Sequence, residues 1–207
     1  MRTNLHNHRI MKLPSILLSA GLMLLAPLAS QAQNDSKYGE TEEQQLLCKE
    51  ALSVYKSYKK QKNYDEAYIQ WRKACEVCPE TASEGLYADG TSFIGKELKK
   101  VDAEDPRHAV LVDSLMYLHD KRMELYPSTK RDPNNRCVVL GRNATDFYKY
   151  NKDAHQEAYT MFKESLDCLG AEASATTLYQ YYTASFYTMK RSLKGDCLLY
   201  TSDAADD

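Results

Sequence analysis

Apolar side chains recur three and four residues apart in successive segments between positions 46 and 193, and short breaks separate these segments. This spacing places them on one face of an α-helix, whereas a strand with one buried face requires strict alternation. The sequence contains no alternating run of any length, and its 8 Gly and 6 Pro residues are few for the many turns of an all-β chain. The spacing therefore predicts an all-α fold of about seven helices.

Proline and glycine residues divide the helical segments into antiparallel pairs. Pro79 and Pro127 each stop a helix, and Gly170 is a C-terminal stop. We expect pairs at about 44–79, 83–127 and 136–170, with a seventh helix from 173 to about 193. The helical domain is thus predicted to cover 44–196, and the polar residues 33–43 before it are predicted to be flexible.

The third helical segment contains three glycines, at positions 85, 90 and 95. Glycine weakens a helix interior because its unfolded backbone has more freedom to lose. Without a side chain, it also lets a neighbouring helix come close. The glycines therefore indicate either a weak helix or a close helix–helix contact.

Residues 56–80 (KSYKKQKNYDEAYIQWRKACEVCPE) combine small residues, aromatic residues and a closing proline at fixed spacings. This pattern resembles the tetratricopeptide repeat, a helix–turn–helix unit of roughly 34 residues. It departs from the repeat at Ala51, where an aromatic residue is usual, and at Tyr55, where glycine is usual. The pattern returns more weakly between 140 and 165. The resemblance implies that ten residues pack in the core of the helix pairs: Tyr58, Tyr64, Ala67, Trp71, Ala74, Pro79, Leu140, Gly141, Ala158 and Phe162.

Residues 1–32 have the pattern of a secretory signal peptide. Basic residues precede an apolar run at 13–28, and Ser30-Gln31-Ala32 supplies small residues at a cleavage site. The run is short and broken by Gly and Pro, which favours cleavage over a membrane anchor. Met11 would itself begin a compact signal peptide, so both Met1 and Met11 are candidate starts. We expect an exported protein, periplasmic or outer-membrane associated, with no membrane span after cleavage.

The segment 197–207 (CLLYTSDAADD) resembles a translated sequencing adapter. That resemblance implies a non-native tail, a native frame that runs beyond Asp196, and a chain that is the N-terminal part of a longer protein. A genuine polar tail is the alternative. The order of leader and helices also resembles secreted tetratricopeptide proteins of the Bacteroidetes, a resemblance that implies no particular activity.

Four cysteines are placed symmetrically about two expected turns. Cys48 and Cys78 lie equally far from the turn at 63, and Cys137 and Cys168 lie almost equally far from the turn near 152. Since such positions face each other in a helical hairpin, we predict disulfides Cys48–Cys78 and Cys137–Cys168, as an exported protein permits. Buried, unpaired thiols are the alternative. Cys75 is left over, and we expect it to pack as a small apolar residue.

No residue pattern points to catalysis, a cofactor or a metal. Cys75 and Cys78 form a C-x-x-C motif, but it lies at the end of a helix, where the helix dipole disfavours a thiolate. A zinc site would need further ligands that the sequence lacks. The net charge of −2 argues against nucleic-acid binding. We therefore predict a non-enzymatic protein without cofactors.

In tetratricopeptide proteins the first helix of a pair lines a concave groove. The resemblance places five residues there: Lys49, Leu52, Lys56, Lys59 and Lys60. Such a basic stripe would bind an acidic peptide or a C-terminal carboxylate, whereas the alternative is a solvated lysine face. We predict a protein-interaction scaffold with a peptide or protein partner. The alternatives are a glycan- or nutrient-binding module of the outer membrane and the N-terminal adaptor arm of a longer enzyme.

Overall fold

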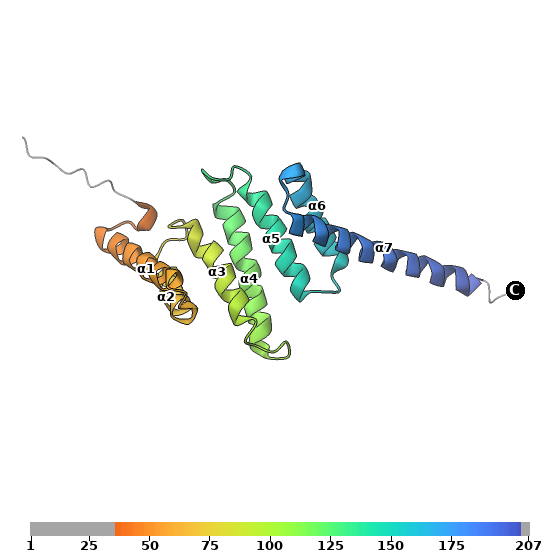
Figure 1. The fold of residues 1–207 in the computed structure, drawn as a ribbon, viewed down its shortest axis with the longest axis horizontal. Helices are drawn as coiled ribbons and strands as arrows, with labels where there is room; N and C mark the ends of the chain where they lie inside the picture. Colours follow the sequence, from red (N-terminus) through yellow and green to blue (C-terminus); the bar gives the residue numbers. More distant parts are fainter. Residues whose placement is uncertain (1–35, 204–207) are drawn as a thin grey trace, which may run out of the picture. The chain divides into compact units, whose positions relative to one another are not determined.

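The computed structural model describes residues 36–203, with side chains from 37 to 192. The expected signal peptide lies outside the described residues, and the segment 197–207 is described only as backbone as far as 203. The described chain contains seven α-helices and no strand (Figure 1). They are α1 (Glu42–Lys60), α2 (Tyr64–Val77), α3 (Glu84–Glu97), α4 (Pro106–Leu125), α5 (Asn135–Tyr150), α6 (His155–Leu169) and α7 (Ala175–Asp203).

Each helix packs against the next one in the sequence, and α5 also contacts α7 (Figure 1). The hairpins α1–α2, α3–α4 and α5–α6 correspond to the three predicted pairs, so the predicted all-α arrangement of helical hairpins is confirmed. Helix α7 continues to Asp203, past the predicted end near 193. No proline interrupts it there. None of the helices in the described part of the chain has the length and hydrophobicity that a membrane span requires.

Side-chain caps begin the first four helices. The Thr41 side chain accepts a hydrogen bond from the Gln44 backbone N–H, and the Gln44 side chain accepts one from the Thr41 backbone N–H. This capping box starts α1 at Glu42. This cap lies within the segment 33–43 that is predicted to be flexible. Ser36–Tyr38 forms a short 3₁₀ helix, and the buried Gln45 side chain donates to the Gly39 carbonyl. Such local polar contacts are not visible in an apolar pattern.

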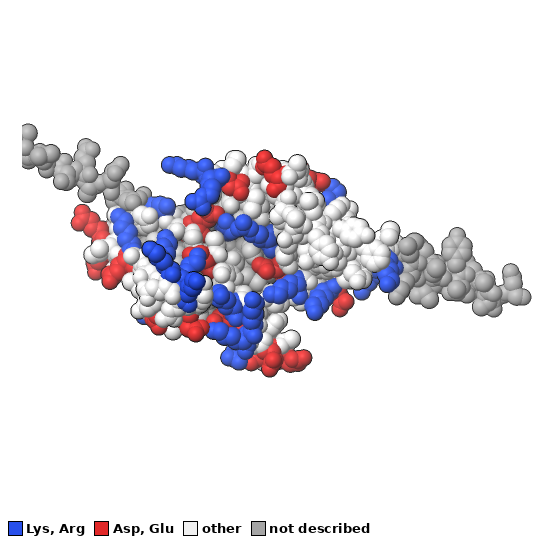
Figure 2. Space-filling view, viewed as in Figure 1, with Lys and Arg blue, Asp and Glu red and all other residues white. Residues whose placement is uncertain are grey.

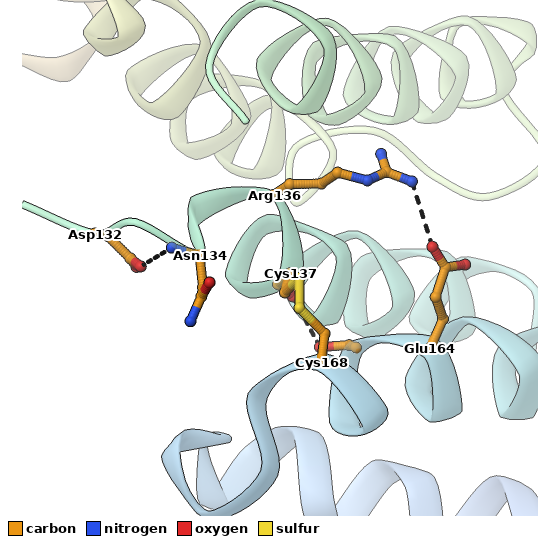
Figure 3. Close-up of a disulfide and its surroundings, with 7 residues drawn as sticks. Asp132, Asn134, Arg136, Cys137, Glu164 and Cys168 are labelled. Carbon is orange, nitrogen blue, oxygen red and sulfur yellow. Dashed lines mark hydrogen bonds and ion pairs between the residues drawn. A yellow bond between two sulfur atoms is a disulfide. The ribbon is translucent and has the colours of Figure 1, made fainter. Parts of the chain in front are cut away.

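Both predicted disulfides are present. Cys48 is bonded to Cys78, with their Cα atoms 4.8 Å apart, and Cys137 is bonded to Cys168, with their Cα atoms 6.1 Å apart. The second bond joins the first turn of α5 to the last turn of α6, beside an ion pair of 3.3 Å between Arg136 and Glu164 (Figure 3). Two disulfides fit an oxidising compartment outside the cytoplasm.

The largest apolar core contains residues from each of the helices α1, α2, α3 and α4, among them Tyr55, Trp71, Phe93 and Leu115. Smaller clusters join α5 to α6 and α7, and α4 to α5. Seven of the ten expected repeat-core residues are buried: Ala67, Trp71, Ala74, Leu140, Gly141, Ala158 and Phe162. Tyr58 and Pro79 are half-buried.

Tyr64 corrects the expectation that all ten residues lie in the core, because it is 38% exposed. It is the first residue of α2, so it stands at the turn edge of the hairpin and not between the helices. The Lys96 ammonium lies 3.9 Å from the centre of its ring.

Polar contacts join the second hairpin to the third. The buried His119 Nε2 lies 2.9 Å from Asp146 Oδ2, and Asn143 donates to Asp120 over 3.1 Å. Arg122, only 7% exposed, donates to Glu84 over 2.8 Å. Glu84 of α3 also accepts from Asn135 of α5 over 3.0 Å, so this group of contacts ties the second hairpin to the third.

Candidate binding groove over helix α3

A groove of about 630 Å³ lies over α3, with α2 on one side and α4 on the other. Its buried floor comes from Trp71, Leu86, Ile94 and Leu118, and from Tyr87 of α3. The more exposed rim consists of Tyr68, Arg72, Cys75, Glu76, Glu80, Asp113, Ser114 and Tyr117, with Cys78 and Pro79 at the end of α2. The groove thus has an apolar floor and a charged, aromatic rim.

Trp71 sets the shape of the floor. Its indole N–H donates to the Leu86 carbonyl over 2.8 Å, and its ring stacks on Tyr68 at a centroid distance of 5.8 Å. A Cβ atom at position 90 would lie 2.5 Å from Cζ2 of Trp71 and 3.0 Å from Cδ1 of Leu118. Gly90 therefore lets Trp71 of α2 and Leu118 of α4 both approach the backbone of α3 closely. Of the two alternatives that the glycines of this segment indicate, this position fits the close helix–helix contact.

Tyr87 anchors one end of the floor. Its hydroxyl donates to the Glu80 carbonyl over 3.1 Å, and its ring lies 6.1 Å from that of Tyr126. Burial, followed by the nearby Glu80 carboxylate, raises the pKa of Tyr87. The hydroxyl therefore stays neutral and acts as a hydrogen-bond donor.

The expected lysine stripe does not line this groove. Leu52 is buried on the same face of α1 as Cys48 and Tyr55, so it belongs to the core and cannot line an open surface. This placement corrects its assignment to a groove.

The four lysines of the stripe have different surroundings on α1. Lys59 forms an ion pair with Asp89 of α3, and Lys49 and Lys56 lie 5.1 and 5.8 Å from the ring centres of Tyr38 and Tyr55. Lys60 is exposed. Figure 2 shows Lys and Arg side chains mixed with Asp and Glu side chains over much of the face in view.

A second surface with few charges lies on α7, and Figure 2 shows an uncharged expanse over α6 and α7. Tyr179 and Tyr182 are 67% and 68% exposed, whereas the neighbouring Tyr181 stacks on Tyr159 at 5.2 Å. Adjacent tyrosines on one helix thus face different surroundings. Tyr179 is an exposed aromatic position that does not line the groove over α3.

Cys75 differs from its expected role. It is a free cysteine that lies exposed at the rim of the groove, not packed as a small apolar residue. In the last turn of α2, the preceding residue Ala74 points into the core, so Cys75 lies on the outer side of the helix. Partial desolvation and then the Glu76 carboxylate raise the pKa of Cys75 to about 11.

This high pKa predicts that the Cys75 thiol reacts slowly with alkylating reagents. Since only the thiolate attacks an alkylating reagent, we expect iodoacetamide to modify Cys75 at least about tenfold more slowly at pH 8 than it modifies an unstructured cysteine peptide. The rate should rise with pH, and Glu76→Gln should increase it. Peptide mapping by mass spectrometry isolates the Cys75 signal. A rate equal to that of the free peptide would contradict the electrostatic account.

Within residues 36–203, no group of three His, Cys, Asp or Glu side chains is placed to hold a metal ion. His119 pairs with Asp146, but it is only 2% exposed and lies in the α4–α5 contact, away from the groove. The arrangement suits binding through shape, aromatic contact and charge. In comparisons with known proteins, neither a protein-family model nor a curated protein matches this chain.

The sequence reasoning missed the groove as a site. It placed the binding surface on the first helix by resemblance to the repeat, whereas the hollow spans α2, α3 and α4. The available signal was the set of aromatic residues at 68, 71, 87 and 117, which the helical pattern also explains as core. Only the three-dimensional packing shows that Trp71 and Tyr87 belong to the buried floor, whereas Tyr68 and Tyr117 belong to the rim.

Proposed function

We propose that this chain is a tetratricopeptide-like interaction module of the bacterial cell envelope that binds a segment of a partner protein in the groove over α3. The groove itself supports this most, because a buried apolar floor inside a polar rim suits the insertion of large side chains from a ligand. The module acts as a scaffold without catalysis or a cofactor.

The two disulfides and the leader pattern support an exported module, in the periplasm or associated with the outer membrane. Lys56 and Lys60, which are exposed on α1, offer a second contact surface for an acidic part of the partner.

A glycan is the second candidate ligand. Tyr117 is 54% exposed and shares the rim with Asp113 and Ser114. A sugar ring stacks its apolar face on an aromatic side chain, and its hydroxyls bond to carboxylates and hydroxyls.

A peptide array followed by titration tests the proposal. The chain has 1 Trp, and this Trp71 lies in the groove floor, so its fluorescence reports occupancy of the groove. For peptides selected on the array, we expect Tyr117→Ser to weaken binding about tenfold, as truncation of an aromatic contact residue does. Tyr179→Ser, an equally drastic change at the exposed surface of α7, should leave affinity unchanged.

Equal effects of the two substitutions would place the binding site outside the groove. Selective binding of oligosaccharides, with no peptide selected on the array, would favour the glycan candidate over the peptide.

A further inference from the structure

We propose that the groove over α3 selects a cationic ligand: a peptide segment in which a large apolar or aromatic side chain is flanked by Lys or Arg. This inference rests on the proposed function and specifies the chemistry of the partner. It reverses the charge expected from the lysine stripe on α1.

The charges that line the groove are mostly negative. They comprise the carboxylates of Glu76, Glu80 and Asp113 and the guanidinium of Arg72. Glu80 lies 3.4 Å from Lys121, which neutralises part of its charge. Among the described residues, no ion pair involves Glu76 or Asp113, both of which are exposed. Two carboxylates, one on each side of the groove, are thus open to a cation from a ligand.

The end of α2 adds to this negative potential. The last turn of α2 contains Glu76 and no basic residue. The unsatisfied carbonyls at a helix C-terminus carry about half a negative charge, which a basic side chain in the last turn commonly offsets. Cys78, the C-terminal cap of α2, lines the groove, so this partial charge lies at the same end as Glu76 and Glu80.

The aromatic rim favours the same class of ligand. A ring attracts an ammonium or guanidinium group that lies within about 6 Å of its centre, and Tyr68 and Tyr117 supply accessible ring surface. The chain already makes such contacts elsewhere, as the 3.9 Å approach of Lys96 to Tyr64 shows. Rings beside carboxylates recognise a cation better than either group does alone.

In addition to burial, nearby carboxylates raise the pKa of two groups of the groove, whereas the pKa of Tyr68 is raised by burial and lowered in part by Arg72. Burial is the main cause of the raised pKa of Cys75, and the Glu76 carboxylate is the second cause. For Tyr87, burial is again the main cause and the Glu80 carboxylate is the second. Both groups resist becoming anions.

Three peptides with one apolar core and different flanks test the inference. The flanks are Lys and Arg, Gln, or Glu, and Trp71 fluorescence and calorimetry measure binding at low salt. We expect the basic peptide to bind about tenfold more tightly than the neutral one and the acidic peptide to bind most weakly, since two exposed ion pairs together give about this factor. Added salt should reduce the preference.

The double variant Glu76→Gln/Asp113→Asn should lose the preference for the basic peptide while still binding the neutral one. The matched control Glu50→Gln/Asp153→Asn removes the same two charges at exposed positions that do not line the groove, and should keep the preference. Thermal unfolding of both variants checks that they fold.

Three outcomes would count against the inference. If the neutral or acidic peptide binds as tightly as the basic one, the charge selection is wrong but the peptide-binding groove stands. If the control variant loses the preference equally, overall charge and not the groove explains it. If none of the three peptides changes Trp71 fluorescence or releases heat, both the charge selection and the proposed peptide function fail.

Discussion

Replacing Cys48 and Cys78 together by Ala should lower the free energy of unfolding by about 3–4 kcal/mol. The bond joins two residues that are 30 positions apart in the sequence. In the chain-entropy model, a cross-link over this distance lowers the conformational entropy of the unfolded chain and thereby stabilises the folded state by about this amount. Helix α1 packs mainly on α2, and the bond joins the open end of this hairpin. Denaturant titration under oxidising conditions measures the effect.

Cys75→Ala is the matched control, since it removes a free, exposed thiol and should change the free energy of unfolding by less than about 0.5 kcal/mol. Cys137→Ala with Cys168→Ala should cost a similar amount to the first pair, because its sequence separation is 31. If each pair costs less than about 1 kcal/mol, the disulfides do not contribute as this account requires. In that case wild-type protein treated with a reductant should also keep its midpoint.

The helices and the disulfides could be predicted from the sequence because both depend on local spacing. A turn at Asn63 that caps α2 forces residues equally distant from it to face each other, which is why the spacing of Cys48 and Cys78 was sufficient. The apolar pattern also located the buried residues of α2, where Trp71 and Ala74 lie on one face.

The groove could not be predicted because it depends on how helices far apart in the sequence are placed. Leu52 shows the difficulty, because Lys49 and Lys56 beside it on the helix are exposed, yet Leu52 itself is buried with Cys48 and Tyr55. The pairing of Glu84 with Arg122 and of His119 with Asp146 likewise joins residues separated by 38 and 27 positions. No periodicity within one helix identifies such partners.

Gly90→Ala and Gly95→Ala should change stability in opposite directions, although both lie in α3. In an exposed helix, alanine in place of glycine stabilises by up to about 1 kcal/mol because it restricts the unfolded backbone. A methyl group at position 95 would have no atom within 4 Å, so Gly95→Ala should stabilise by about 0.5–1 kcal/mol. At position 90 the added methyl would meet the Trp71 ring at 2.5 Å.

The Trp71 ring cannot move aside cheaply, because its N–H is bonded to the Leu86 carbonyl and its face stacks on Tyr68. Overpacking of this kind costs about 1–3 kcal/mol, which exceeds the gain in helix propensity, so Gly90→Ala should destabilise. It should also shift Trp71 fluorescence and weaken ligand binding, whereas Gly95→Ala should leave both unchanged. Denaturant titration and fluorescence of the two variants side by side measure this difference. Stabilisation by both substitutions would mean that Trp71 and Leu118 do not pack against Gly90, and the floor of the groove would have to be built differently.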